Sequence, residues 1–497
     1  MSQSIATKNS TVVTSPKVAL DDVLRELHHR DPSLRHIKPY IESLPLERIS
    51  IIPPIDQVMP DLNRSFAVVS LDSQAVILQE LPTQDGRVEV VFRKQADFNL
   101  LLRNYHVLDH SGMITTAAHA WLNHPERRQF DRVVFEPSGA QEGDYNLYQG
   151  LGVIPQKGNC SLLRNHILEI ICNGDKPIFD YLERWVADIL QKPSNLPGIA
   201  VVLRGAEGVG KGIFGNAILR LTAPHSVHVI QANQILGRFN GLLLGVLYAF
   251  LDESFWAGDK QFESSLKGLI TERELTVEHK GKEAIKVSNY ARFLMASNSD
   301  WVVPAGHGAR RFLVLDVSDK RKEDFAYFKE LKKQIDHGGL EAWAHHLLKL
   351  DLTDFELRNV PKTKALFEQK VESFNSMQRF IYEILLEASN CAGANGIDWA
   401  REVPKGAFYQ SYLIKAGEIG ERRRGDQIKF SNTLKLILGI HEDRTSIKGQ
   451  RERVWVFPSV DICRERFAKY MDADIAWPQI KDLKLSDKIP HKLTKRY

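Results

Sequence analysis

Apolar residues recur at helical spacing in some parts of the chain and in short unbroken runs in others. Helical spacing covers residues 21–60 and ends at the proline pair of the stretch "IIPPI". Between Phe66 and Phe135 the runs are short and β-like, and Asp85-Gly86 separates two of them, which is typical of a β-hairpin. This part of the chain therefore predicts a small α+β domain.

Strand-like and helix-like runs alternate in the middle of the chain, after a helical stretch over residues 162–190. The predicted elements are strand 199–204, helix 212–221, strand 244–251, helix 262–272, strand 291–296 and strand 312–317. Such alternation is typical of a parallel sheet covered by helices. Helices resume at 322–350 and 363–390, and the last hundred or so residues mix short helices with the β-like "RVWVFP".

Composition narrows the class of protein. The chain has 497 residues, of which 43% are hydrophobic and 26% charged, which is ordinary for a globular protein of about two to four domains. No segment approaches the roughly 18 uninterrupted apolar residues of a membrane span, and the polar N-terminus lacks the apolar core of a signal peptide. The four cysteines form no C-x-x-C pair, which argues against a zinc site. We expect a protein of a reducing cytoplasm with no membrane partner.

Charge is distributed unevenly along the chain. Residues 401–497 hold 21 Lys and Arg against 13 Asp and Glu, an excess of +8, whereas the whole chain carries only +4. A basic C-terminal quarter favours contact with a polyanion. A solvated charged surface explains the same numbers, so charge alone leaves both interpretations open.

A glycine-rich segment follows the first strand of the alternating region. The stretch "VVLRGAEGVGKGIFGNAILRL", from Val201 to Leu221, passes from an apolar run through glycines and a lysine into a helical run. This order is typical of a phosphate-binding loop, whose backbone N–H groups face an anion at a helix N-terminus. Lys211 would reach the phosphates, but Gly212 stands where a Ser or Thr hydroxyl usually helps to hold Mg²⁺. From the loop alone, a nucleotide site and a glycine-rich turn are both open.

Polar residues end the two strands that follow. Asp252 and Glu253 close the apolar run "LGVLYAFLDES", where Asp252 would hold Mg²⁺ through water and Glu253 would polarise an attacking water molecule. Asn298 closes "ARFLMASNSDW" and would contact the γ-phosphate or align that water. The alternative interpretations are ordinary surface acids and an Asn that caps a turn.

Two arginines precede the last strand of the alternating region. Arg310 and Arg311 lie in "GHGARRFLVLDV", and in ring-shaped ATPases a guanidinium often enters the neighbouring subunit's site to stabilise transition-state charge. A pair of surface arginines is the alternative.

These pieces, in this order and spacing, resemble superfamily 3 helicases, and most closely the helicase part of phage and mobile-element primase-helicases related to the poxvirus D-five-type proteins. The resemblance is carried by "GAEGVGKG", "GRFNG", "FLDESFWAGDK", "LKGLITERELTVEHKGKEAIKVSNYARFLMASN" and "GARRFLVLDVSD", and it covers roughly residues 60–370. In that branch a Gly after the loop lysine is a subfamily trait. The resemblance implies an AAA+-like P-loop NTPase core that assembles into a ring, usually a hexamer, and moves on single-stranded and forked DNA in a prokaryotic host cell.

The resemblance also implies roles for individual residues. ATP would be bound by the loop residues Gly205, Ala206, Glu207, Gly208, Val209, Gly210, Lys211 and Gly212. Asp252 and Glu253 would be the Mg²⁺-binding and base acids, Asn298 the first sensor, and Arg310 or Arg311 the arginine that acts in the neighbouring subunit.

A DNA-gripping hairpin is expected between the acid strand and the sensor strand. In "ELTVEHKGKEAIKV" two β-like runs flank a tip that carries His279, Lys280 and Lys282. A basic tip that points into a ring channel would hold the phosphate backbone without reading sequence. A charged surface hairpin is the alternative.

The C-terminal segment resembles winged-helix segments appended to such helicases. The expected elements are a helix, a basic turn with Arg422, Arg423 and Arg424, a candidate recognition helix at 430–438 and a β-wing. The wing carries Lys448, Arg451 and Arg453, which would contact duplex DNA. The alternative is a helical domain that stabilises the ring.

These observations predict five segments and no primase activity, because the first 150 or so residues contain no D-x-D pair in a strand context. The segments are a disordered tail (1–20), an N-terminal accessory or collar domain (21–160), the superfamily 3 AAA+ core (161–355), a helical linker (356–400) and a basic winged-helix-like DNA-binding domain (401–497). A separate primase or polymerase is an expected partner.

The predicted function is that of an ATP-dependent replicative DNA helicase of a phage or mobile element. The first alternative is a DNA-binding replication initiator or scaffold whose ATP site switches assembly with little turnover. The second is an AAA+-type remodeller of proteins, which the basic hairpin argues against.

Overall fold

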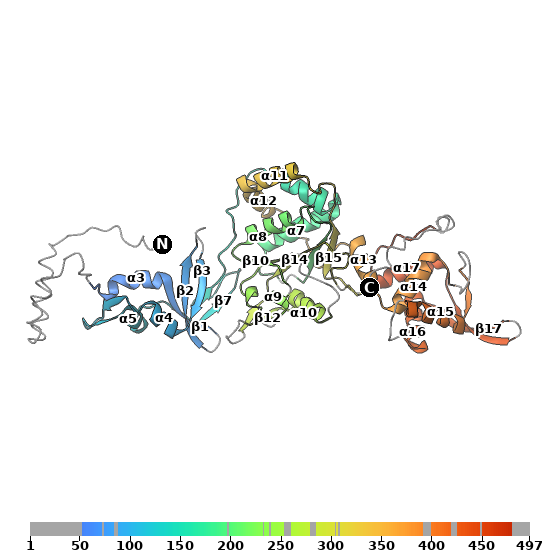
Figure 1. Ribbon diagram of the computed structural model, residues 1–497, viewed down its shortest axis with the longest axis horizontal. Coiled ribbons are helices and arrows are strands. Elements are labelled where there is room, and N and C mark those ends of the chain that lie inside the picture. Colours follow the sequence, from blue (N-terminus) through green and yellow to red (C-terminus); the bar gives the residue numbers. More distant parts are fainter. Residues whose placement is uncertain are drawn as a thin grey trace, which may run out of the picture. The chain divides into compact units, whose positions relative to one another are not determined.

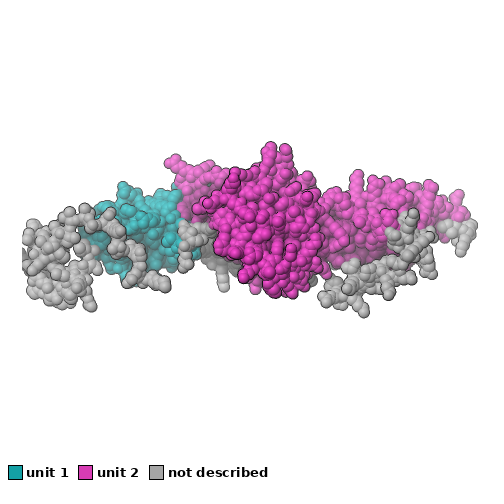
Figure 2. Space-filling model, turned by 90° about the horizontal axis from the view of Figure 1, so that it is seen from above, with its two compact units in different colours: residues 1–132 teal, residues 133–497 magenta. Residues whose placement is uncertain are grey.

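The computed structural model describes residues 52–71, 74–83, 88–195, 198–231, 233–237, 240–252, 260–278, 285–303, 305–306, 309–390, 399–418, 425–447 and 450–479. The chain divides into two compact units, residues 1–132 and 133–497 (Figure 2). Among the described residues no helix is both long and apolar enough to cross a membrane.

A four-stranded sheet, a two-stranded antiparallel pair and three helices form the described part of the first unit (Figure 1). The four strands are, in spatial order, β3 (Val88–Arg93), β2 (Gln74–Pro82), β1 (Phe66–Leu71) and β6 (Gln129–Phe130). The helices are α3 (Ile55–Ser65), α4 (Gln95–Leu101) and α5 (Ala117–Asn123). A separate pair is formed by β4 (His106–Leu108) and β5 (Ile114–Thr116). The rings of Phe66, Phe98 and Trp121 meet in its core at centroid distances of 5.0–6.4 Å. The sequence predicts this mixture of helices and strands.

The start of this unit differs from the prediction in one respect. The hairpin is confirmed, because β2 and β3 pair antiparallel from Pro82 and Val88 onward, although Asp85 and Gly86 lie outside the described residues. Pro54 is the N-cap of α3, so the proline pair precedes a helix whose start the sequence did not predict, and residues 21–51 lie outside the described residues. Proline is tolerated at a helix N-terminus because the N–H that it lacks has no partner there.

The central sheet of the second unit has five parallel strands, which confirms the predicted parallel sheet. In spatial order they are β10 (Ser226–Val229), β11 (Tyr248–Asp252), β14 (Arg292–Ser297), β9 (Ala200–Arg204) and β15 (Phe312–Asp316). Burial on both faces explains the apolar runs, and every residue of β14 is buried. The strand predicted at 244–251 begins only at Tyr248, because Gly241–Leu243 form a short 3₁₀ turn. The edge strand β10 was not predicted, since its four residues form no apolar run.

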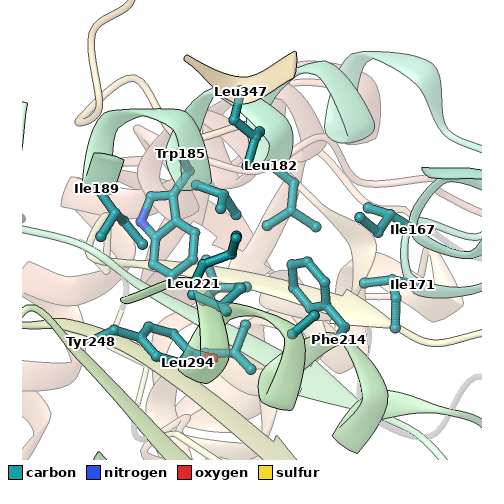
Figure 3. Close-up of a cluster of buried hydrophobic side chains, with 14 of the residues drawn as sticks. Ile167, Ile171, Leu182, Trp185, Ile189, Phe214, Leu221, Tyr248, Leu294 and Leu347 are labelled. Carbon is teal, nitrogen blue, oxygen red and sulfur yellow. The ribbon is translucent and has the colours of Figure 1, made fainter. Parts of the chain in front are cut away.

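Helices cover both faces of this sheet (Figure 1). One face carries α7 (Lys176–Gln191), α8 (Lys211–Thr222) and α12 (Leu340–Leu347), and the other carries α9 (Asn233–Leu236) and α10 (Lys260–Thr271). On the α7 side, Trp185 and Phe214 pack toward the strand residues Tyr248 and Leu294 (Figure 3). This core fixes α8 against the sheet and thereby positions the loop that leads into it.

Three long helical stretches of the prediction are interrupted. Residues 162–190 form α6 (Ser161–His166), a π-helical turn and α7, and residues 322–350 form α11 (Phe325–Gln334), a π-helical turn and α12. Residues 363–390 form α13 (Lys364–Glu372) and α14 (Ser376–Glu387). The interruptions lie at Gly174 and Gly338, both with positive φ, and at Asn375, which caps α14.

The last part of the second unit has its own core and sheet. It contains α14, α15 (Lys405–Glu418), α16 (Gln427–Leu438) and α17 (Val460–Met471), with an antiparallel sheet of β16 (Glu402–Pro404), β18 (Gln450–Val456) and β17 (His441–Ile447) in that spatial order. The buried Lys370 of α13 donates hydrogen bonds to the carbonyl oxygens of Met471 (2.6 Å) and Asp472 (3.2 Å) at the end of α17. This lysine ties α13 to the C-terminal helices.

Candidate functional site

The glycine-rich loop lies at the carboxyl edge of the central sheet. It leaves β9 after Arg204 and enters α8 at Lys211, so the N-terminus of a 12-residue helix points out of this edge. Gly208 (φ 78°) and Gly210 (φ 98°) have left-handed backbone conformations that other residues rarely adopt. The loop therefore depends on its glycines for the curl that brings a helix N-terminus, which attracts anions, to the end of the strands.

Close packing is a further reason for glycine at two positions of the loop, Gly205 and Gly210. A Cβ atom at Gly205 would lie 3.2 Å from the Cβ and carbonyl oxygen of Val317. At Gly210 it would lie 2.6 Å from His166 Cε1. Gly212, by contrast, has room: the nearest atom to a Cβ there is Asn216 Nδ2 at 3.9 Å.

Lys211 is buried and directed at the loop. Its Nζ donates hydrogen bonds to the carbonyl oxygens of Gly205 (2.7 Å) and Ala206 (2.8 Å) and to Oδ1 of Asn298 (2.8 Å). Asn298 follows β14, the neighbour of β9, and Gly205 N–H donates to the Ser297 carbonyl oxygen (3.2 Å). The structure thus brings the loop lysine and the predicted sensor into direct contact.

His166 supports the loop from beneath and was not predicted from the sequence. Its Nε2 donates to the Gly210 carbonyl oxygen (3.3 Å), and its Nδ1 lies 3.1 Å from the Tyr327 hydroxyl. Because a carbonyl can only accept, Nε2 carries the proton and Nδ1 accepts from Tyr327. Burial lowers the pKa of His166 to about 4, against a small opposing effect of the Gly210 hydrogen bond. The ring is therefore neutral at physiological pH.

Asp252 ends β11 at the same edge of the sheet, and β14 lies between β11 and β9, the strand that the loop follows. Its register partner on β14 is Ala296, so the ends of β11, β14 and β9 lie side by side. His228 Nε2 lies 3.7 Å from Asp252 Oδ2. Glu253 lies outside the described residues.

An ion-pair cluster flanks the loop on the other side. Arg204 contacts both carboxylate oxygens of Asp316, with Nε–Oδ1 and Nη2–Oδ2 distances of 2.6 and 2.9 Å, and it also pairs with Glu368 of α13. Burial by itself would lower the pKa of Arg204, but the hydrogen bonds to the two carboxylates raise it above its usual value. The residue before the loop is therefore fixed to α13.

Arg310 and Arg311 lie at the opposite edge of the sheet. The backbone carbonyl oxygen of Arg311 accepts a hydrogen bond from the N–H of Ala200 (2.8 Å), at the start of β9. The glycine-rich loop follows the other end of that strand. The two edges are separated by four residue steps of about 3.3 Å each. Within one chain these arginines are therefore remote from Lys211.

The predicted DNA-gripping hairpin is confirmed only in its strands. β12 (Glu274–Val277) pairs antiparallel with β13 (Ile285–Ser288). Its tip residues His279, Lys280 and Lys282 lie outside the described residues.

A hairpin of β17 and β18 with charged residues of both signs forms part of the C-terminal sheet. Arg451 and Arg453 are exposed on β18, and Arg453 is the register partner of Arg444 on β17. Arg453 Nη1 also lies 3.9 Å from Glu442 Oε1, and Glu442, Asp443 and Glu452 balance the three arginines of the described strands. Arg444 was not among the predicted DNA-binding residues. Its place in the strand that pairs with the predicted wing strand was the signal that could have identified it. Arg422, Arg423, Arg424 and Lys448 lie outside the described residues.

Comparison with known proteins gives both sequence and fold similarities. Residues 203–311 match a family of unknown function (DUF5906). The chain is 24% identical over 222 residues to the DNA primase-polymerase of Nitratiruptor phage NrS-1, an alignment that covers 44% of this chain and 30% of the phage protein. Two apo structures of the NrS-1 C-terminal region superpose with TM-scores of 0.60 and 0.58, at 17% and 16% identity, covering 80% and 82% of this chain and 98% and 100% of those chains. This chain shares their fold.

The side chains at the carboxyl edge suit a phosphorylated ligand with a divalent ion. An ammonium group and a helix N-terminus attract phosphate, and a carboxylate suits Mg²⁺. Gly208 and Gly210 give the loop the left-handed backbone conformations that this curl requires. The donor set therefore fits a nucleoside triphosphate, with one deficiency, the hydroxyl that Gly212 does not supply.

Proposed function

We propose that this protein is an ATP-dependent DNA helicase that acts in the replication of a phage or mobile genetic element. The observation that carries the proposal is the position of Lys211 at the N-terminus of α8, with its Nζ held by two loop carbonyl oxygens and by Asn298. A phosphate that displaced these neutral acceptors would give the Lys211 ammonium an anionic partner, so that both donor and acceptor carry charge. The similarity to a phage DNA primase-polymerase supports a role in DNA replication.

Each residue at the edge of the sheet has a distinct task in this proposal. The loop from Gly205 to Gly212 and Lys211 would bind the phosphates of ATP, Asp252 would hold Mg²⁺, and Asn298 would contact the γ-phosphate or align water. Glu253, next to Asp252 in sequence, would polarise the attacking water. The strand order and the loop support a P-loop NTPase core of the AAA+ type.

The proposal extends to assembly and DNA binding. Arg310 or Arg311 would enter the site of a neighbouring subunit in a ring. A hexamer is the usual ring of the helicases that this chain resembles. Helices α15 and α16, followed along the chain by β17 and β18, support a winged-helix-like domain that would bind duplex DNA through Arg444, Arg451 and Arg453. The tip of the β12–β13 hairpin would hold single-stranded DNA. A separate primase or polymerase would be the protein partner. The protein would act in the cytoplasm of a prokaryotic host.

ATP hydrolysis by the purified protein, with and without single-stranded DNA, tests the proposal. We expect turnover that rises with DNA in the wild type and is lost in Lys211→Ala and in Glu253→Gln. Glu253→Gln should still bind ATP, because it removes the water-polarising group and leaves the phosphate cradle intact. Normal turnover in either variant would contradict the assigned roles.

The same assay separates the helicase from an assembly switch. ATP binding without turnover in the wild type would favour a replication initiator or scaffold, for which the C-terminal domain should prefer one DNA sequence. If phosphate contacts dominate DNA binding, affinity should fall steeply with salt, and Arg451→Ala should lower the slope of log K against log[salt] by about one.

A further inference from the structure

His228 lies beside Asp252 at the carboxyl edge of the central sheet. It is the register partner of Phe250, and the two rings stack with centroids 5.2 Å apart and planes within 9°. Phe250 packs against α8, because a Cβ atom at Gly215 would lie only 2.6 Å from its ring. Side chains two residues apart on a strand share a face, so Asp252 and His228 lie on the face of the sheet that carries α8.

The imidazole and the carboxylate face each other without a hydrogen bond. The 3.7 Å between His228 Nε2 and Asp252 Oδ2 is too long for one. In the described part of the chain neither side chain makes a hydrogen bond to another group, and the exposed fractions are 40% for His228 and 35% for Asp252. Two atoms that bind one metal ion at about 2.1 Å can lie up to about 4.2 Å apart. One ion therefore fits between them.

The loop gives an independent reason for an additional ligand. Gly212 supplies no hydroxyl to a metal ion, so the protein ligand that such a loop usually provides is missing. We propose that His228 Nε2 binds the divalent ion that accompanies the nucleotide, sharing it with Asp252 in place of the loop hydroxyl. This inference rests on the proposed nucleotide site. The stack on Phe250 holds the ring in position for this role.

An imidazole ligand alters the choice of metal. Mg²⁺ prefers oxygen ligands, whereas imidazole nitrogen suits transition metals and affinity rises from Mn²⁺ onward in the divalent series. The site should therefore bind Mn²⁺ with ADP more tightly than Mg²⁺ with ADP. Replacement of His228 should remove most of that preference.

Electron paramagnetic resonance with Mn²⁺ and ADP tests the inference without reference to turnover. The full-length protein is labelled with ¹⁵N-histidine, and pulsed spectra of its Mn²⁺–ADP complex report any nitrogen that is bound to the metal. We expect a ¹⁵N coupling in the wild type. The variant His228→Phe keeps a ring stacked on Phe250 but should lose the coupling and bind Mn²⁺ about tenfold more weakly or worse, the loss that even an outer-shell partner of a metal causes.

Two further variants sharpen the comparison. His441→Phe replaces an exposed histidine on β17, in a different sheet, and should retain both the coupling and the affinity. The double variant His228→Phe/Gly212→Ser restores the loop hydroxyl at a position with room for it, and should recover Mn²⁺ affinity without the ¹⁵N coupling. A double variant as weak as His228→Phe would contradict the substitution of one ligand for the other.

The outcomes distinguish this inference from the proposed function. A wild-type Mn²⁺–ADP complex without ¹⁵N coupling, and with unchanged affinity in His228→Phe, would overturn the ligand role of His228 while leaving the nucleotide site in place. Failure of the wild type to bind ADP with either metal would overturn the nucleotide site and, with it, the inference.

Discussion

Two glycines of the loop, Gly210 and Gly212, meet different surroundings although they lie only two positions apart. Gly210 has φ 98°, and a Cβ there would lie 2.6 Å from His166 and 2.9 Å from Phe328. We expect Gly210→Ala to lower the free energy of unfolding by about 1–3 kcal/mol, through backbone strain and overpacking. Gly212→Ala should be neutral or stabilising by up to about 1 kcal/mol, because a helical Gly is replaced where there is room. Urea unfolding of both variants measures the difference, and equal losses would show that the packing at Gly210 carries no cost.

The buried His166 makes stability depend on pH in a defined window. Its pKa is about 4 in the folded protein and 6.5 in the unfolded chain. Below pH 6.5 the unfolded chain takes up a proton that the folded protein does not, so stability is lost as the pH falls from 6.5 toward 4. Between pH 6.5 and 4.5 we expect the wild type to lose about 2 kcal/mol more than His166→Gln, whose side chain does not titrate.

Urea unfolding at a series of pH values gives this difference between the two proteins. Other titrating groups affect both proteins alike and cancel. Parallel stability profiles of the two proteins would mean that His166 has the same pKa in the folded protein as in the unfolded chain.

At the scale of elements, α13 links the segment that follows the predicted sensor to the C-terminal helices. Gln369 of α13 is fully buried; its Oε1 accepts hydrogen bonds from the N–H groups of Val302 (2.7 Å) and Val303 (3.2 Å), and its Nε2 donates to the Asp300 carbonyl oxygen. We expect Gln369→Ala to cost about 2–4 kcal/mol, because it leaves buried backbone groups without partners.

Hydrogen exchange of residues 299–305 shows whether this loss is local. The amides of Val302 and Val303 should exchange faster in Gln369→Ala than in the wild type. Lys364→Ala, at an exposed position on the same helix, is the matched control and should leave them unchanged. Equal exchange in all three proteins would contradict a role of Gln369 in holding this segment.

Elements with a strong local pattern were predictable, and the others depended on tertiary contacts. The strands β9, β14 and β15 are buried on both faces, so their apolar runs identified them. The edge strand β10 has only four residues, one of which is the exposed His228, and no periodicity distinguishes it. The π-helical turn Ile167–Ile171 is apolar like the helix before it, which concealed the interruption at Gly174. In the turn Ile335–Gly339 only Ile335 is apolar, and it continues the spacing of Leu331.

The candidate site shows the same division. The contact of Lys211 with Asn298 followed from a parallel sheet, because the ends of adjacent parallel strands meet at one edge. The contacts of Gly210 with His166 and of Asp252 with His228 join residues 44 and 24 positions apart, and neither histidine lies in the loop, acid or sensor motif. Such partners are set by packing, which a single sequence does not reveal.

At the scale of the whole molecule, the predicted catalytic residues of one chain lie on two opposite edges of one sheet. Lys211, Asp252 and Asn298 are at the carboxyl edge, and Arg310 and Arg311 are at the amino edge. A rigid sheet keeps these edges apart. If an arginine takes part in hydrolysis, a second copy of the chain must supply it.

Mixing two inactive variants tests this requirement directly. Lys211→Ala should abolish nucleotide binding in its own subunit, and Arg311→Ala should leave binding intact but abolish hydrolysis in the site of its neighbour. In a mixed ring, an Arg311→Ala subunit beside a Lys211→Ala subunit combines an intact loop with an intact arginine at one interface. We therefore expect the mixture to recover part of the DNA-stimulated ATPase activity that each variant lacks alone. The same experiment with Arg310→Ala identifies which arginine acts, and a mixture that stays inactive with both would show that neither arginine acts across a subunit interface.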